Sequence, residues 1–204
     1  MTSYPVIFDV ERQETYDKTQ VVIRLVIVTI LSILSIPIGL IYLAIPVAAA
    51  VLVSQRGAAR YFAEAETNIV RWLRFLMRFY SYLALLTDTF PNEEAGHAVH
   101  FSVTPIGTPT AGNILLRIIL AIPHAIVLGL LGVVAGMLGV IAAIMILVQN
   151  SYPEGIFAFL RGYLRWYARV FVYLAGLADA YPPFALDTGP ETQPQAPTEQ
   201  PQPM

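Results

Sequence analysis

The sequence predicts an all-α membrane protein with a minor β component, built from two parallel repeats. Of its 204 residues, 56% are apolar and only 13% are charged, a balance outside the range of ordinary soluble domains. Residues 25–55 and 118–153 carry no charged side chain, and each stretch is longer than one membrane crossing requires. Segments near the ends of the two halves also match without gaps at an offset of 91 residues. These features together favour two copies of one membrane-embedded unit.

Each unit is expected to open with a short strand. Residues 4–10 and 97–103 alternate apolar and polar side chains, which is typical of a strand with one buried face.

A helical hairpin is expected next, over residues 21–54 in the first half and 114–149 in the second. As a single helix, either uncharged stretch would measure roughly 45 to 55 Å, much more than a hydrocarbon core of about 30 Å. The break in the first stretch is expected near Pro37, because proline removes a backbone donor. In the second stretch, glycines that include Gly132 and Gly136 mark the expected bend. The prediction is therefore four short membrane helices.

An amphipathic helix with a stripe of arginines is expected after each hairpin, over residues 59–86 and 155–178. Residues three or four positions apart share one helix face, and the opposite face of each helix is aliphatic and aromatic. Such a helix is typical of the membrane interface. The stripes are Arg71, Arg74 and Arg78 in the first helix, and Arg161, Arg165 and Arg169 in the second.

Four of these arginines, Arg74, Arg78, Arg165 and Arg169, are candidate sites for anionic lipid head groups, since guanidinium groups bind phosphate in a bidentate manner. The alternative is that the arginines are topology signals at the interface, or that they pair with Asp88 and Asp179. All twelve basic residues lie outside the hairpins or at their ends. The positive-inside rule then predicts a multi-pass protein with both termini in the cytoplasm.

The internal match divides the chain into residues 1–92, residues 93–186 and a tail. Residues 73–91 align with residues 164–182, so that Asp88 matches Asp179. Residues 187–204 are rich in proline and glutamine and have no apolar anchor, so we expect a disordered cytoplasmic tail.

The second half resembles the bacterial membrane family catalogued as domain of unknown function 4389. The resemblance rests on an arginine leading into Ile-Pro-His, a Tyr-Pro-x-Gly step, a paired-arginine helix and a terminal Asp-x-Tyr-Pro-Pro-Phe. In this sequence these are Arg117 with residues 122–124, residues 152–155, Arg165 with Arg169, and residues 179–184. The first half departs from the pattern, with Ile38 where a histidine is expected. The resemblance implies a membrane location and no particular activity. Together with the predicted orientation, we expect the bacterial inner membrane.

His124 is the one ionisable side chain expected deep within a hairpin. It follows Pro123, whose ring leaves a backbone carbonyl without its usual donor. The imidazole is a candidate for proton relay, or for a structural role in which it satisfies such a carbonyl.

Two further pairs are candidate structural positions. Gly132 and Gly136 have the spacing at which another helix can pack closely, although the same residues also fit the expected bend or simple packing within the chain. Asp88 and Asp179 each precede a proline by three residues, and we expect them to close turns through bonds to the backbone.

The sequence contains no recognisable enzyme motif, and we expect neither a metal nor a cofactor. A net charge of −2 argues against nucleic acid as a partner. We therefore predict a non-enzymatic scaffold or accessory subunit whose partners are anionic lipid and a membrane protein or a second copy. The alternative is a small transporter or channel with a path between the two hairpins.

Overall fold

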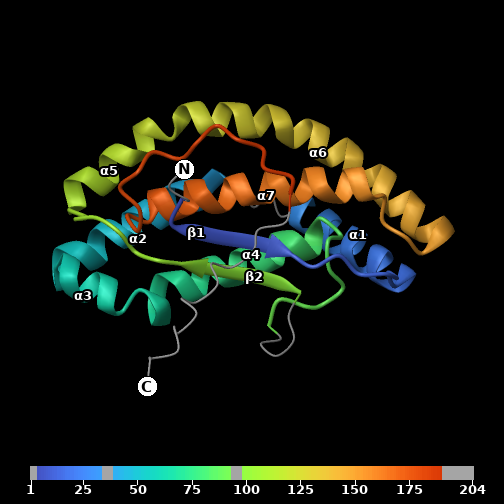
Figure 1. The fold of residues 1–204 in the computed structure, drawn as a ribbon, viewed down its shortest axis with the longest axis horizontal. Helices are drawn as coiled ribbons and strands as arrows, with labels where there is room; N and C mark the ends of the chain where they lie inside the picture. Colours follow the sequence, from blue (N-terminus) through green and yellow to red (C-terminus); the bar gives the residue numbers. More distant parts are fainter. Residues whose placement is uncertain (1–3, 34–38, 93–97, 190–204) are drawn as a thin grey trace, which may run out of the picture.

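The computed structural model describes residues 4–33, 39–92 and 98–189. Most of these residues are helical, and two short strands form one small sheet. Figure 1 shows long helices that share the long axis of the molecule, with α6 (Ile122–Gln149) along the top and α7 (Glu154–Leu174) beneath it. The helical class with a minor β component, predicted from the sequence, is confirmed.

The sheet joins the two halves of the chain. Strand β1 (Val6–Val10) pairs antiparallel with β2 (Val99–Val103), and Phe8 lies opposite Phe101. Alternate side chains of β1 are buried, as expected for a strand with one face on the core. β1 packs on α7 and β2 packs on α4 (Arg71–Leu83), so each strand covers a helix from the other half.

The first uncharged stretch forms α1 (Lys18–Ile33) and α2 (Gly39–Arg56). The predicted break near Pro37 lies outside the described residues. α1 packs on α6, whereas α2 packs on α5 (Ala111–Leu120), and Figure 1 shows α1 and α2 toward opposite ends of the view. Within the described residues, the predicted hairpin of two helices packed on each other is therefore wrong. Each helix instead buries its inner face on the second half.

The second uncharged stretch bends before its glycines and not at them. α5 ends at Leu120, and α6 then runs without interruption for 28 residues. Pro123 lies in the first turn of α6, where a missing backbone donor costs nothing. A glycine inside a helix costs only about 1 kcal/mol relative to alanine, so Gly132 and Gly136 do not break it. The predicted second hairpin, residues 114–149, is therefore wrong.

The two arginine-striped segments differ from each other. Residues 59–86 were expected to form one helix, but they form α3 (Ala58–Ala63), a π-helical turn (Glu66–Val70) and α4. The break follows Glu64, whose carboxylate binds Arg56 and Arg60.

Helix α7 is the central helix of the molecule. All residues from 168 to 178 are buried, because α7 packs against α2, α4, α5, α6 and β1. The predicted interfacial location is therefore wrong for this helix. The predicted tail boundary at residue 187 is also wrong, since residues 187–189 bind α7.

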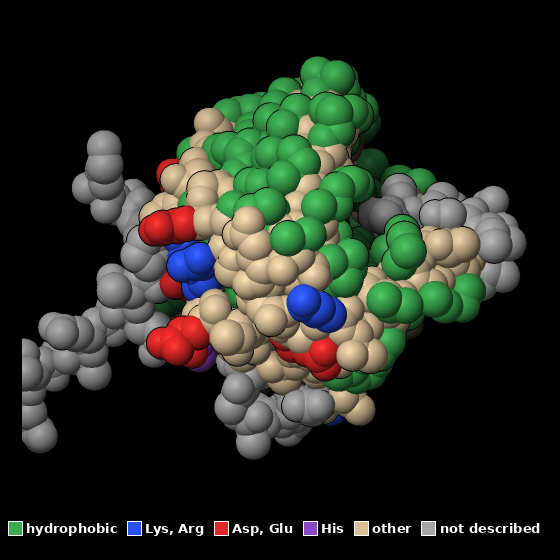
Figure 2. Space-filling model, turned by 90° about the vertical axis from the view of Figure 1, so that its right-hand side faces the viewer, with side chains coloured by type: hydrophobic (Ala, Val, Ile, Leu, Met, Phe, Trp, Pro, Cys, Tyr) green, Lys and Arg blue, Asp and Glu red, His purple; other side chains and the backbone are tan. Residues whose placement is uncertain are grey.

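The outer helices expose a continuous apolar surface. α2 packs beside α5 and α1 beside α6, so the exposed side chains of the four helices adjoin. Figure 2 shows hydrophobic side chains gathered over the top of the molecule, where α6 lies, and charged side chains at the left and bottom. We call this surface the apolar face. It comprises Val22, Ile23, Leu25, Val26, Val28 and Ile30 of α1, Leu40, Leu43, Val47 and Val51 of α2, Leu115, Leu116, Ile119 and Leu120 of α5, and Ile122, Ile126, Leu130, Val133, Val134, Met137, Val140, Ile141, Ile144, Leu147 and Val148 of α6.

Candidate functional site

Two buried arginines, one in each half, bind the aspartates that follow α4 and α7. Arg24 is 2% exposed, and its guanidinium donates to the Asp88 carboxylate at 2.8 Å and to the carbonyl of Thr87 at 2.7 Å. The same guanidinium lies over the ring of Tyr82, 4.1 Å from its centroid. A buried charge is stable only when it is paired and hydrogen-bonded. Arg24 meets this through Nη2, whereas its Nε and Nη1 have no hydrogen-bond partner among the described residues.

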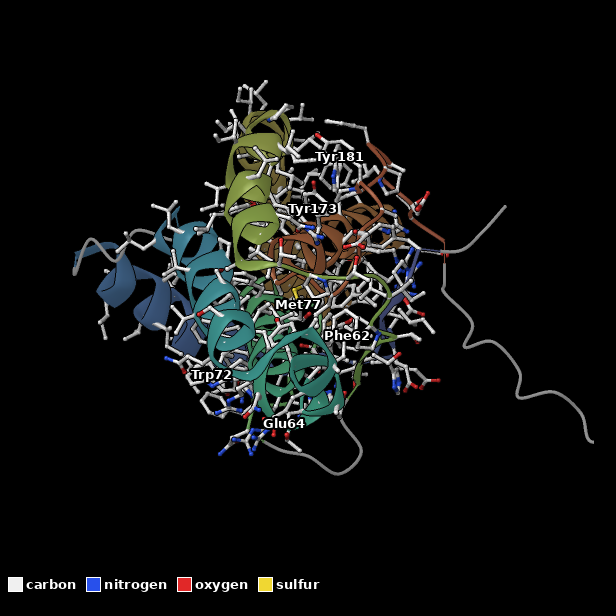
Figure 3. The ribbon with its side chains drawn as sticks, turned by 90° about the vertical axis from the view of Figure 1, so that its left-hand side faces the viewer. Phe62, Glu64, Trp72, Met77, Tyr173 and Tyr181 are labelled. Atoms are coloured by element: carbon white, nitrogen blue, oxygen red, sulfur yellow. The ribbon has the colours of Figure 1, made fainter. Side chains whose placement is uncertain are left out.

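Arg117 repeats this arrangement in the second half. Its guanidinium binds Asp179 at 2.5 Å, donates to the carbonyl of Ala178 at 2.6 Å and lies 4.8 Å from the ring centroid of Tyr173. Figure 3 shows Tyr173 and Tyr181 close together beside α5, and their ring centroids are 5.7 Å apart. Sequence reasoning missed both pairs, although a single arginine inside an otherwise apolar helix is a signal that could have indicated them.

Asp88 and Asp179 do more than close a local turn. Asp88 accepts the backbone N–H of Asp17 at 2.9 Å, and Asp179 accepts that of Thr108 at 2.9 Å. In each case the donor lies 71 residues earlier in the chain, just before α1 or α5. The prediction of carboxylate-to-backbone bonds is met, but the bonds join distant segments. The alternative in which Asp88 and Asp179 pair with the arginine stripes is wrong.

Arg165 and Arg169, predicted as lipid ligands, are buried inside the protein. Arg165 is 2% exposed and donates to the carbonyls of Phe8 at 2.9 Å, Asp187 at 2.6 Å and Gly189 at 2.7 Å. Arg169 pairs with the Asp187 carboxylate at 2.6 Å. The lipid site expected at these two arginines is therefore wrong, because internal oxygens already bind their guanidinium groups.

Arg74 and Arg78 are half-buried and line a groove. Arg74 binds the Glu66 carboxylate, and its Nε–H donates a hydrogen bond to the carbonyl of Phe101 at 3.2 Å. The groove has a volume of about 610 Å³ and a mixed basic and aromatic lining. We call it the arginine groove, and it is lined by Arg71, Trp72, Arg74, Phe75, Arg78, Pro91 and Asn92.

His124 lies in an aromatic enclosure and is fully buried. Its Nδ1 accepts the indole N–H of Trp166 at 3.0 Å, and its ring stacks on Phe184 with a centroid separation of 4.0 Å. Because Nδ1 accepts a hydrogen bond, the ring is neutral and its proton is on Nε2. Nε2 has no hydrogen-bond partner among the described residues. The geometry therefore favours the structural role over proton relay, and the partner is an indole where a backbone carbonyl was expected.

Gly132 and Gly136 face different surroundings in α6. A Cβ at Gly132 would lie 2.8 Å from Oη of Tyr163, so this glycine allows α7 to approach closely. A Cβ at Gly136 would meet nothing within 4 Å, because Gly136 borders an apolar groove of about 610 Å³ between α1, α4, α6 and α7. Of the predicted helix-packing pair, one member is therefore used inside the chain and the other is open.

Burial and ion pairing shift several titratable groups outside the apolar helices. Burial raises the pKa of Tyr16 to about 12, and it also raises the pKa of Tyr61, whose hydroxyl donates to the carbonyl of Ala175 at 2.5 Å. The hydrogen bond from Arg60 lowers the pKa of Glu64. Both phenols are protonated near neutral pH, and the Tyr16 oxygen accepts the backbone N–H of Gln13 at 3.4 Å. Among the described residues, no three His, Asp or Glu side chains converge to hold a metal ion.

These observations define a mostly helical protein with a small sheet. Within the described part of the chain, α6 is the one helix that is long and apolar enough to cross a membrane. Residues 112–185 match the family model described as a domain of unknown function, number 4389. The match covers Arg117, His124 and Asp179, and it supports the resemblance noted in the second half. No curated protein and no solved structure matches the chain.

Proposed function

We propose that the chain is a non-enzymatic membrane protein that acts as a scaffold or accessory subunit. The apolar face carries this proposal, because large apolar side chains adjoin along four helices. Soluble monomers rarely expose an apolar patch of more than a few hundred Å². A surface of this kind is typical of contact with lipid or with a membrane partner.

We further propose that the apolar face lies in one leaflet, with the helix axes along the membrane plane. α7 packs along α6, and β1 packs on α7, so a crossing by α6 would carry both elements into the bilayer as well. The side of the molecule away from α6 exposes Glu11, Glu66 and Asp187, with side-chain exposures of 71%, 61% and 52%. A carboxylate at the bilayer centre costs at least about 2.5 to 3.5 kcal/mol. Insertion by the apolar face alone avoids this cost.

A cytoplasmic location for both termini is part of the same proposal. Tyr4 donates its hydroxyl to the carbonyl of Arg169 in α7 at 3.4 Å, and the Asp187 carboxylate pairs with the guanidinium of the same arginine at 2.6 Å. The two described ends of the chain therefore lie on the same helix, α7. We infer from the arginine distribution that this side faces the bacterial cytoplasm.

Two tandem copies of one unit are also part of the proposal, and repeated contacts support it. Leu86 N–H donates to the Ser81 carbonyl at 3.0 Å, as Leu177 N–H does to that of Val172 at 3.1 Å, an offset of 91 residues. Leu85 and Gly176, also 91 apart, both have a positive φ, 62° and 71°. A positive φ is uncommon for leucine, so its recurrence at the matched position supports a shared origin.

The apolar groove that Gly136 borders provides a place for a partner helix. Its walls are almost entirely aliphatic and aromatic, so it gives a polar solute few hydrogen-bonding groups. This lining favours the scaffold over the alternative of a transporter or channel. Crosslinking with mass spectrometry in native membranes tests the scaffold, and recovery of the chain without any stable partner would count against it.

Single cysteines test the embedding, since the natural chain has none. We expect cysteines at positions 122, 133 and 148 of α6 to resist a membrane-impermeant maleimide from both sides. Cysteines at positions 11, 56 and 66 should react from one common side. Labelling of positions 122 and 148 from opposite sides would show that α6 crosses the membrane and would overturn the leaflet arrangement.

A further inference from the structure

The arginine groove places three guanidinium groups beside two exposed aromatic rings. Arg71, Arg74 and Arg78 fall at helical positions i, i+3 and i+7, so their side chains leave α4 within a narrow arc. Trp72 is 69% exposed and Phe75 is 44% exposed, and both lie next to this arc on the helix. Figure 3 shows Trp72 on the side of the molecule where α1 and α2 lie, away from the sheet. In that view, Trp72 therefore lies on the same side as two of the helices that carry the apolar face.

The charge balance of the groove differs from that around α7. Arg165 and Arg169 are held by internal carbonyls and by two aspartates. In the groove, Glu66 is the carboxylate that binds Arg74, and its side chain is 61% exposed. Arg71 has no ion pair within the described part of the chain. Arg71 therefore contributes positive charge that no carboxylate among the described residues neutralises, and an anionic occupant complements it.

We propose that the arginine groove binds the phosphate of an anionic phospholipid head group. Guanidinium groups of the stripe bind the phosphate oxygens, and Trp72 and Phe75 occupy the interface beside the first acyl carbons. This inference rests on the proposed membrane embedding and assigns its lipid contact to α4. It also restricts the predicted head-group site to the first half, since the matching arginines of α7 are buried.

Binding is best measured with the full chain in neutral detergent micelles doped with phosphatidylglycerol, so that the result does not depend on how the chain sits in a bilayer. The test variant is Arg71→Gln with Arg74→Gln. The matched control is Arg56→Gln with Arg60→Gln, which removes two exposed charges outside the groove. We expect the test variant to lose roughly 30-fold in affinity, from about 1 kcal/mol for each arginine at a lipid surface, and the control to bind as the natural chain does.

Three outcomes would overturn the proposal. The first is an equal loss of affinity in the test and control variants, which would indicate general electrostatic attraction. The second is an unchanged affinity in the test variant. The third is equally tight binding of inorganic phosphate, which would identify a free anion as the ligand. Circular dichroism establishes that each variant is folded. Membrane retention of the test variant separates the head-group proposal from the proposed membrane embedding. If the variant loses head-group binding but is retained in the membrane normally, the substitutions have changed the groove and left the embedding intact. Failure of the natural chain to be retained would instead overturn the embedding.

Discussion

At the scale of single residues, the position of each arginine depends on which carboxylate and carbonyl oxygens bind its guanidinium group. Arg24, Arg117, Arg165 and Arg169 are all buried, and each one has an aspartate partner. A guanidinium group inside a protein is tolerated only when hydrogen bonds replace its hydration. Arginine therefore forms buried hydrogen bonds between segments in α7, whereas in α4 it lines a surface groove.

Replacement of Arg117 by methionine is expected to destabilise the fold by about 3 kcal/mol, because Asp179 and two carbonyls lose their donor. For a chain of this size, that corresponds to a fall of roughly 10 °C in melting temperature. Thermal unfolding in detergent measures the change, and Arg24→Met should give a similar one. Arg60→Met removes an exposed ion pair and is the control, with no detectable shift expected. An unshifted Arg117→Met would show that the buried pair contributes no stability.

The bond between His124 and Trp166 predicts non-additive substitutions. His124→Phe or Trp166→Phe alone leaves one buried polar atom without a partner, at a cost of about 1 to 3 kcal/mol. The double substitution removes both polar atoms, so its cost should be smaller than the sum of the two. A double-mutant cycle on melting temperatures checks this. Strictly additive losses would mean that the bond does not form.

At the scale of elements, the surroundings of each helix outweigh the intrinsic helix propensity of its residues. α6 remains continuous through its glycines because the helix has few polar alternatives: an unpaired backbone group in an apolar setting costs more than a glycine does. α4 is separated from α3 by a break that follows Glu64, where two arginines converge on one carboxylate. Glycine content by itself therefore does not set helix length in this chain.

The two glycines of α6 should respond to alanine in opposite directions. Gly136→Ala is expected to raise stability by about 0.5 to 1 kcal/mol, because the helix gains propensity and the new methyl meets open space. Gly132→Ala should lower stability by about 1 kcal/mol, since it displaces the Tyr163 hydroxyl from its bond to the Leu128 carbonyl. Chemical denaturation of both variants makes the comparison. If Gly136→Ala also weakens a crosslink to a partner helix, Gly136 is a docking position.

At the scale of the whole molecule, charge and apolar surface are separated onto different sides. The apolar face covers α1, α2, α5 and α6, whereas charged side chains gather at the left and bottom of the view in Figure 2. The antiparallel strand pair and the crossed packing of α1 on α6 and α2 on α5 bring both halves into one body. This separation is the property on which the proposed embedding in one leaflet depends.

Polar substitution of the apolar face is expected to release the chain from membranes. A triple change of Leu130, Val133 and Met137 to glutamine removes three exposed side chains, each contributing about 1.5 to 3 kcal/mol on transfer from water. The fraction extracted by alkaline carbonate should rise. Ile106→Gln is the control, because Ile106 is 57% exposed but lies outside the apolar face. Equal extraction of the natural and triple-substituted chains would contradict membrane contact by α6.

The sequence alone determined which segments are helical, that a strand precedes each uncharged stretch, and that the second half resembles the family it matches. These properties follow from local composition and periodicity, which a single segment contains in full. Tertiary structure decided that α6 is unbroken, that α7 is the central helix, and that Arg24 and Arg117 bind Asp88 and Asp179. The physical reason is that an amphipathic pattern indicates which side of a helix needs polar or apolar surroundings. It does not indicate which residues of the folded chain form those surroundings. For Arg165 the hydrogen-bonding partner is Asp9, 156 residues away in the chain, and only the packing of β1 on α7 brings the two side chains together.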